Sequence, residues 1–212
     1  MNKKLISGIV IVIVVVVGIA YFNSFVAKPI CWPYCENMTD QDREKIKESA
    51  TADWKTYTNS IDGYSFDYPS KLSISSNNGE VYLSHSIPFD NYDGGCDMKG
   101  DSKLSKTLND FGMSVRVVSG KVTPSYIDGT YSKGELTGNW AYKGAEGCGN
   151  TEYYFPITNN RTLIITKQEI QILSPVVSAE VRDKVLAVPG VISYNESKEI
   201  VEKILSTLKF TN

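Results

Sequence analysis

An uncharged apolar segment close to the N-terminus is the feature that most constrains this chain. Fifteen of the eighteen residues from Leu5 to Phe22 are apolar, and none is charged. As a helix rising 1.5 Å per residue, the segment would be about 27 Å long, close to the hydrocarbon thickness of a bilayer. Because a lone span must bond its backbone groups internally, we expect residues 5–22 to cross the lipid bilayer as one helix.

The charges that flank this segment predict its orientation. Lys3 and Lys4 precede it, and only Lys28 follows closely. By the positive-inside rule, residues 1–4 should be cytoplasmic and the chain beyond the segment extracytoplasmic. We therefore expect a signal-anchored, single-pass protein of the cell membrane with a cytoplasmic N-terminus.

Three other interpretations of the N-terminal segment compete with a membrane anchor. Cleavage as a signal peptide needs small residues before the cut, and residues 18–20, Gly-Ile-Ala, are acceptable, so cleavage stays open. A lipoprotein is disfavoured because Cys31 lies well beyond the apolar run. A type IV pilin is disfavoured because Gly8 is followed by no nearby glutamate, and Pro29 and Pro33 would break its long helix.

The overall charge is small. The 212 residues include 22 Lys+Arg and 24 Asp+Glu, a net charge of -2, which argues against a nucleic-acid partner. Without the three lysines that flank the apolar segment, the exterior carries about -5. The length allows one domain of ordinary size.

A change in composition divides the extracytoplasmic part into a stalk over residues 23–53 and a domain over residues 54–212. The stalk contains a C-x-x-x-C motif, Cys31-Trp-Pro-Tyr-Cys35. This spacing lacks the two-residue gap of thioredoxin-like motifs, so we expect a small disulfide ring, with a redox or metal role as the alternative. A capping box predicts a short solvated helix over residues 39–50.

The other two cysteines, Cys96 and Cys148, lie in glycine-rich segments that we expect to be long loops. An even number of cysteines outside the membrane favours disulfides, and a ring of Cys31 with Cys35 leaves Cys96 to pair with Cys148. A four-cysteine zinc site is the alternative, but structural zinc sites use closely spaced ligand pairs and only one pair here is close. No metal or cofactor is therefore expected.

Period-two patterns predict an antiparallel sheet in the domain. Tyr64, Phe66 and Tyr68 alternate with polar residues, which is typical of a half-buried strand, and they belong to a hairpin over residues 54–69. Further strands are expected over residues 72–76, 81–85, 111–117, 140–142, 152–157 and 162–168.

The pattern becomes helical near the C-terminus. Apolar residues between 201 and 208 fall at i, i+3, i+4 and i+7, and Ser193 with Glu196 forms a capping box before them. A weaker helical stretch covers residues 180–186. Strands with added helices predict an α+β domain, an antiparallel β-sheet with helices packed on its faces.

The two ends of the domain resemble those of PsbP-like domains. Trp-x-x-Tyr-x-Asn at residues 54–59, Gly-Tyr-Ser-Phe-x-Tyr-Pro at 63–69 and the closing helix Ile-Val-Glu-Lys-Ile-Leu-Ser-Thr-Leu-Lys-Phe at 200–210 carry the resemblance. It implies a PsbP-like sandwich over residues 54–212, as in membrane-anchored bacterial proteins of unassigned function. The matching positions are packing residues, so the resemblance implies no binding residue.

The sequence offers little for catalysis. Its one histidine, His85, is expected at the end of a strand, and neither a Gly-x-Ser-x-Gly elbow nor a His-x-x-x-His pair is present. Residues 144–149 are rich in glycine but lack the Lys and Ser/Thr of a P-loop, so we expect a loop there. An envelope hydrolase using His85 with an acidic partner is kept as an alternative.

The acidic stretch Asp90–Asp101 imitates part of a calcium-binding EF-hand loop. The matching residues are Asn91, Asp93, Gly94 and Asp97. Phe89 stands where the first carboxylate belongs and Gly100 where the bidentate glutamate belongs, so we expect a solvated loop. A calcium-dependent surface domain is the second alternative.

Aromatic residues gather in the second half of the domain: Tyr126, Tyr131, Trp140, Tyr142, Tyr153 and Tyr154. Aromatic residues are favoured in strands, so we expect them to fill the core, with a carbohydrate or peptide recognition surface as the alternative. The anchor and the lack of a catalytic constellation favour a non-catalytic binding or assembly module with a protein or glycan partner in the envelope.

Overall fold

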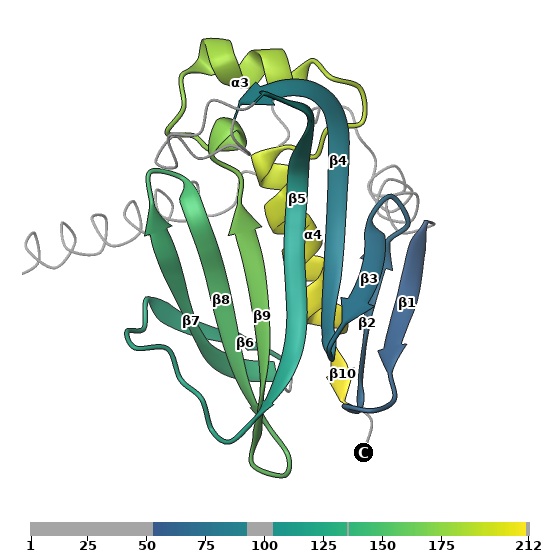
Figure 1. Ribbon diagram of the computed structural model, residues 1–212. Coiled ribbons are helices and arrows are strands. Elements are labelled where there is room, and N and C mark those ends of the chain that lie inside the picture. Colours follow the sequence, from purple (N-terminus) through teal and green to yellow (C-terminus); the bar gives the residue numbers. More distant parts are fainter. Residues whose placement is uncertain (1–52, 93–103, 135, 211–212) are drawn as a thin grey trace, which may run out of the picture. The chain divides into compact units, whose positions relative to one another are not determined.

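The structure is a computed structural model that describes residues 53–92, 104–134 and 136–210 (Figure 1). The chain divides into two compact units, Met1–Ala50 and Thr51–Asn212, and every described residue belongs to the second. The expected anchor, the stalk with Cys31 and Cys35, and Cys96 fall outside the described residues. Among the helices that are described, none has the length and apolar character needed to cross a bilayer.

Two antiparallel sheets make up most of the domain. The larger has the strand order β3-β4-β5-β9-β8-β7-β6, and the smaller has the order β1-β2-β10. The strands are β1 (Trp54–Asn59), β2 (Tyr64–Pro69), β3 (Ser73–Asn77), β4 (Glu80–Tyr92), β5 (Leu104–Ser119), β6 (Gly129–Lys133), β7 (Leu136–Ala145), β8 (Cys148–Ile157), β9 (Arg161–Glu169) and β10 (Lys209–Phe210). With two α-helices added, the expected β-rich α+β class is confirmed.

The helices follow β9. They are the short 3-10 helix η4 (Gln171–Leu173), α3 (Ala179–Leu186) and α4 (Tyr194–Thr207). As the capping box predicts, the Ser193 hydroxyl accepts a hydrogen bond of 3.2 Å from the backbone N–H of Glu196 at the start of α4. The apolar face of α4, which includes Ile204, packs into the main core against both sheets.

Apolar side chains form two separate clusters. The main core joins both sheets to α4, and it includes buried aromatic rings of β2 such as Phe66. The smaller cluster consists of Ile87, Leu108, Leu173 and Val185. On β4 and β5 a polar residue falls between a member of one cluster and a member of the other: His85 on β4 and Asp110 on β5. On the neighbouring strand β9, Lys167 follows Ile165 of the main core and precedes Ile170, which packs against the smaller cluster. We call these three residues the polar layer.

Three local expectations were wrong. His85 lies inside β4 and not at its end, because β4 continues past it through two register shifts. A regular central strand excludes proline, but an irregular one with a bulge tolerates Pro88. The glycine-rich segment around Cys148 is no long loop. Glu146 and Gly147, with φ of 51° and 78°, make a two-residue hairpin turn between β7 and β8. The closing helix was expected to run to Phe210, but α4 ends at Thr207, and Lys209–Phe210 form the strand β10. The strand β6 was not expected.

Candidate functional site

A cleft of about 650 Å³ opens between the strands β6 to β9 and helix α4. This volume falls within the roughly 300–1,000 Å³ of clefts that hold small ligands. The sheet contributes Tyr131, Trp140, Tyr142, Glu146, Gly147, Thr151, Tyr153, Lys167 and Glu169; the helix contributes Tyr194, Lys198 and Glu202; and the segment after η4 contributes Ser174, Pro175 and Val176. We call this site the aromatic cleft.

Cross-strand pairing builds the floor of the aromatic cleft. Trp140 of β7 pairs with Tyr153 of β8, and the period of two brings Tyr142 and Thr151 to the same face. The Tyr153 ring is stacked on Phe155 at 6.3 Å, and Tyr131 stands edge-on to Tyr153 at 5.9 Å. These ring contacts hold the floor in one arrangement.

Two glycines shape the walls of the aromatic cleft. A Cβ at Gly129 would lie 2.6 Å from Nε1 of Trp140, so the indole occupies the space that a side chain would need. A Cβ at Gly147 would lie 2.5 Å from the Ser174 hydroxyl oxygen, so the turn between β7 and β8 closes against the segment after η4. Both close approaches require the absence of a side chain.

The aromatic cleft is lined by one ion pair and by charged groups that are not ion-paired among the described residues. The buried Lys167 ammonium lies 2.7 Å from a carboxylate oxygen of Glu169, whose other oxygen accepts a hydrogen bond of 2.8 Å from the Thr151 hydroxyl. Among the described residues, the carboxylates of Glu146 and Glu202 have no ion-pair partner. These two groups are therefore available to a ligand.

Three tyrosines of the aromatic cleft have raised pKa values. Burial, with the nearby Glu202 and Glu169 carboxylates, raises the pKa of Tyr153 to about 12. Burial and the Glu202 carboxylate likewise raise the pKa of Tyr131 to about 12, and burial followed by Glu169 raises the pKa of Tyr142. At neutral pH these phenols are protonated, so they act as hydrogen-bonding groups and not as bases.

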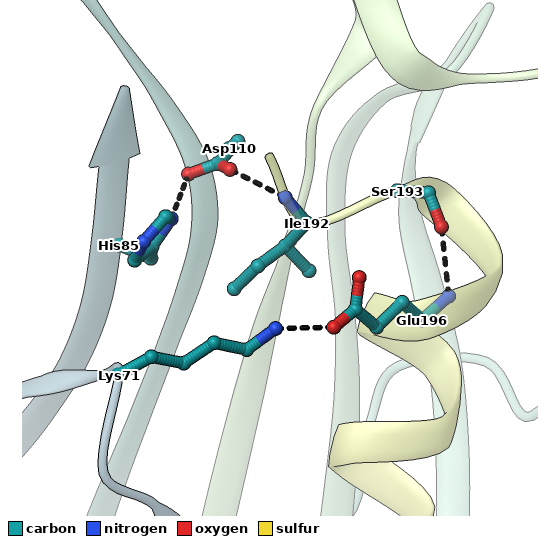
Figure 2. A network of polar contacts seen from close by, with 6 residues as sticks. All are labelled: Lys71, His85, Asp110, Ile192, Ser193 and Glu196. Carbon is teal, nitrogen blue, oxygen red and sulfur yellow. Dashed lines mark hydrogen bonds and ion pairs between the residues drawn. The ribbon is translucent and has the colours of Figure 1, made fainter. Parts of the chain in front are cut away.

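The single histidine forms a dyad with a buried carboxylate (Figure 2). His85 pairs with Phe111 across the sheet while Ser86 pairs with Asn109, so Asp110 is the extra residue of a β-bulge. Asp110 is 1% exposed, and one of its oxygens lies 2.7 Å from Nδ1 of His85.

The second oxygen of Asp110 accepts a 2.7 Å hydrogen bond from the backbone N–H of Ile192, two residues before α4. The dyad therefore fastens the start of α4 to β4 and β5. The hydrolase alternative requires such an acidic partner for His85. Within the described part of the chain, however, no Ser, Thr or Cys side chain is hydrogen-bonded to the His85 ring.

The aromatic residues singled out in the sequence separate into two groups. Tyr131, Trp140, Tyr142 and Tyr153 line the aromatic cleft, and two of them, Tyr131 and Tyr153, also pack against the main core. Tyr126 is 47% exposed and lies outside the cleft. Tyr154 faces the opposite side of β8, where it bonds to Glu152 and Lys143.

Sequence reasoning missed the contribution of α4 to the aromatic cleft. Tyr194, Lys198 and Glu202 are spaced at i, i+4 and i+8, which places them on one face of the helix. That spacing is present in the sequence, but the apolar positions of the same helix form the stronger pattern. Lys167 and Glu169 were missed as well, although their spacing of two residues at the end of β9 places them on one face of the strand.

The remaining predicted site residues have mixed outcomes. Cys148 begins β8, is 7% exposed and is disulfide-bonded, but its partner lies outside the described residues, so the pairing with Cys96 stays a prediction. Asp90 is exposed and lies 3.1 Å from the Lys106 ammonium. Most of the acidic stretch is not described, and the described ranges contain no cluster of three or more metal-ligating side chains.

Comparisons with known proteins show no family for this chain. No family model and no curated protein matches the chain. A 1.50 Å crystal structure of a protein from Bacteroides thetaiotaomicron VPI-5482 is similar with a TM-score of 0.38 and 12% identity, over 74% of this chain and 48% of that one. The chain thus spans about half the length of that protein, and a likeness of this degree carries no argument about function.

Proposed function

We propose that this protein is anchored in the cell membrane by residues 5–22 and displays a non-catalytic binding or assembly module, with a PsbP-like arrangement, outside the cytoplasm. The apolar run, with two lysines before it, supports the anchor and its orientation. The even number of cysteines supports an oxidising compartment. The aromatic cleft is the binding site of this module.

The observation that carries the proposal is the chemistry of the cleft lining. Five aromatic rings and a few charged groups converge on one concave surface, which is typical of small-ligand sites. General acid–base catalysis near neutral pH requires a group that titrates there. The pKa values of Tyr131 and Tyr153 are raised to about 12, and the Lys167 ammonium is paired with Glu169, so binding fits these groups better than catalysis.

Fluorine NMR of the full-length chain labelled with 5-fluorotryptophan tests this proposal. The chain has three tryptophans, and a Trp140→Phe variant assigns the resonance in the cleft. Polysaccharide, lipid and peptide fractions of a cell envelope are added in turn. We expect one fraction to shift the Trp140 resonance saturably, to leave Trp54 on β1 unmoved, and to be recovered chemically unchanged.

Two results would reject the proposal. One is a Trp140 resonance that no envelope fraction moves at any concentration tested. The other is recovery of the bound compound in a cleaved form, which would indicate an enzyme.

The contact between His85 and Asp110 supports a second candidate function, the envelope hydrolase. A neutral histidine held by a carboxylate is the usual general base of hydrolases. Hydrolysis of ester, amide or glycoside reporter substrates should then require both side chains, so that His85→Ala and Asp110→Asn each abolish turnover. Turnover that survives His85→Ala would eliminate this candidate.

A further inference from the structure

We propose that the aromatic cleft binds an uncharged glycan, an inference that rests on the binding-module function above. The apolar C–H faces of sugar rings pack on aromatic rings, while hydroxyl groups at their edges form hydrogen bonds. The cleft offers both kinds of contact. Trp140, Tyr142 and Tyr194 are partly exposed rings, and single charged groups surround them.

The hydrogen-bonding inventory of the cleft favours hydroxyl groups. Glu146 and Glu202 carry carboxylates, which only accept hydrogen bonds, whereas the Lys198 ammonium only donates them. A sugar hydroxyl does both, so one kind of ligand group satisfies all three side chains. Lys198 and Glu202 lie one turn apart on α4 and can bond to neighbouring hydroxyls of one ligand.

A cationic ligand fits poorly at the face of the Tyr194 ring. The faces of aromatic rings attract cations, but Tyr194 is already engaged by two lysines. The Lys167 ammonium lies 5.6 Å and the Lys198 ammonium 5.5 Å from the centre of its ring. A third cation at this ring would be repelled by both.

Anionic and purely apolar ligands fit no better. The cleft is lined by three carboxylates, those of Glu146, Glu169 and Glu202, and Lys198 is its one lysine without a carboxylate partner among the described residues. A phosphate or carboxylate ligand would therefore meet a net negative surface. An acyl chain would remove water from these charged groups without replacing its hydrogen bonds, which is unfavourable.

A peptide is the remaining competitor. Extended peptides are commonly recognised by pairing with an exposed sheet edge. At the cleft, β7, β8 and β9 each pair with a strand on both sides, and β6, which contributes Tyr131, is the edge strand of the sheet. The floor formed by β7 to β9 therefore presents side chains and not free backbone groups. The geometry therefore favours a ligand recognised through its faces and hydroxyls.

The experiment uses the full-length chain in a detergent whose headgroup contains no sugar, since glucoside and maltoside detergents would compete. A glycan array identifies uncharged oligosaccharides, and calorimetry then compares them with tetramethylammonium, inorganic phosphate, decanoate and a mixture of unstructured peptides. Two cleft variants are Trp140→Ala and Glu202→Gln. The matched control is Tyr82→Ala, which removes a 40% exposed aromatic ring outside the cleft.

We expect saturable binding of at least one uncharged oligosaccharide and of none of the other probes. Trp140→Ala should weaken this binding by at least about tenfold, because it removes the largest ring of the lining. Glu202→Gln should weaken it by about fivefold, since a charged hydrogen-bond acceptor becomes neutral. Tyr82→Ala should leave it unchanged.

The outcomes separate this inference from the proposed function. If a cation, anion, acyl chain or peptide binds in place of a glycan and Trp140→Ala abolishes that binding, the glycan inference fails while the binding module stands. If no probe and no glycan binds, both fail. Glycan binding that is indifferent to both cleft variants also overturns the inference. Because Glu202 is exposed on α4, its variant remains informative even if Trp140→Ala does not fold.

Discussion

The replacement of Asp110 by Leu should be among the most destabilising single changes in this domain. The carboxylate is buried and bonds at 2.7 Å to both the His85 ring and the backbone N–H of Ile192. Leucine has a similar size but leaves both partners without an acceptor. A hydrogen bond to a charged group contributes about 1.5–3 kcal/mol, and the loss of one partner from a buried charged network costs about 3–5 kcal/mol.

Two other variants provide the scale for this effect. In Asp110→Asn, the amide oxygen can still accept from Ile192 and the amide nitrogen can donate to a neutral His85, so we expect a loss of about 1–2 kcal/mol. Lys71→Ala breaks the ion pair with Glu196 that is also drawn in Figure 2. Both side chains of that pair are more than a third exposed, so the loss should stay below about 1 kcal/mol.

Thermal and urea unfolding, followed by tryptophan fluorescence and far-ultraviolet circular dichroism, measure these differences. For a domain of this size, 1 kcal/mol corresponds to roughly 2–4 °C in Tm, so Asp110→Leu should melt about 10 °C below the parent chain. If Asp110→Leu unfolds within about 0.5 kcal/mol of the parent, the assignment of Asp110 as a buried fastening for α4 is refuted.

Three further changes test the packing and the electrostatics. Gly138→Ala places a Cβ 2.1 Å from the backbone oxygen of Tyr154, so we expect Tm to fall by about 5 °C, and an unchanged Tm would contradict the close approach. Burial opposes the ionisation of Glu152, but hydrogen bonds from Lys143 and Tyr154 and the charges of Lys143 and Arg116 lower its pKa below 4.5 overall. The stabilisation by ionised Glu152 is present above pH 4.5 and is lost as the pH falls through the lowered pKa. The difference in unfolding free energy between the parent and Glu152→Gln should therefore shrink from pH 6 to pH 3. A constant difference would contradict this assignment. Tyr131→Phe removes a buried hydroxyl that makes no hydrogen bond of normal geometry among the described residues, although the Glu202 carboxylate lies near enough to raise its pKa. The free energy of unfolding of this variant should equal that of the parent or exceed it by up to about 1 kcal/mol, and a clear loss would show that the hydroxyl is bonded.

The regular parts of the fold were predictable from the sequence, and the irregular parts were not. Alternation in β2 and the i, i+4 spacing in α4 are direct consequences of strand and helix geometry, so both elements were expected. A bulge inserts one residue and breaks the period of two, which concealed the inward position of Asp110. The turn at Glu146 was missed because glutamate rarely adopts a positive φ.

The candidate site was predictable only in part, because it combines elements that are distant in the chain. The aromatic residues of β6, β7 and β8 were visible as a local concentration, but their strand propensity suits a core and a binding surface equally. What separates the two uses is the position of α4, which brings Tyr194 to the same cleft as the rings of the sheet. No pattern within the strands encodes that position.

The polar layer connects the dyad to the aromatic cleft. Asp110 and Lys167 line one small cavity together with Tyr194 and Ser197 of α4. Apolar residues in this layer would let α4 slide between the two apolar clusters, since hydrophobic contacts are not directional. Hydrogen bonds are directional, so Asp110 fixes the start of α4. A cation–π contact needs the ammonium over the face of the ring, so Lys167 meets the Tyr194 ring at one place. The polar layer therefore determines how the cleft-facing side of α4 is positioned relative to the sheet. A binding surface that is built from a sheet and a helix depends on this relative position.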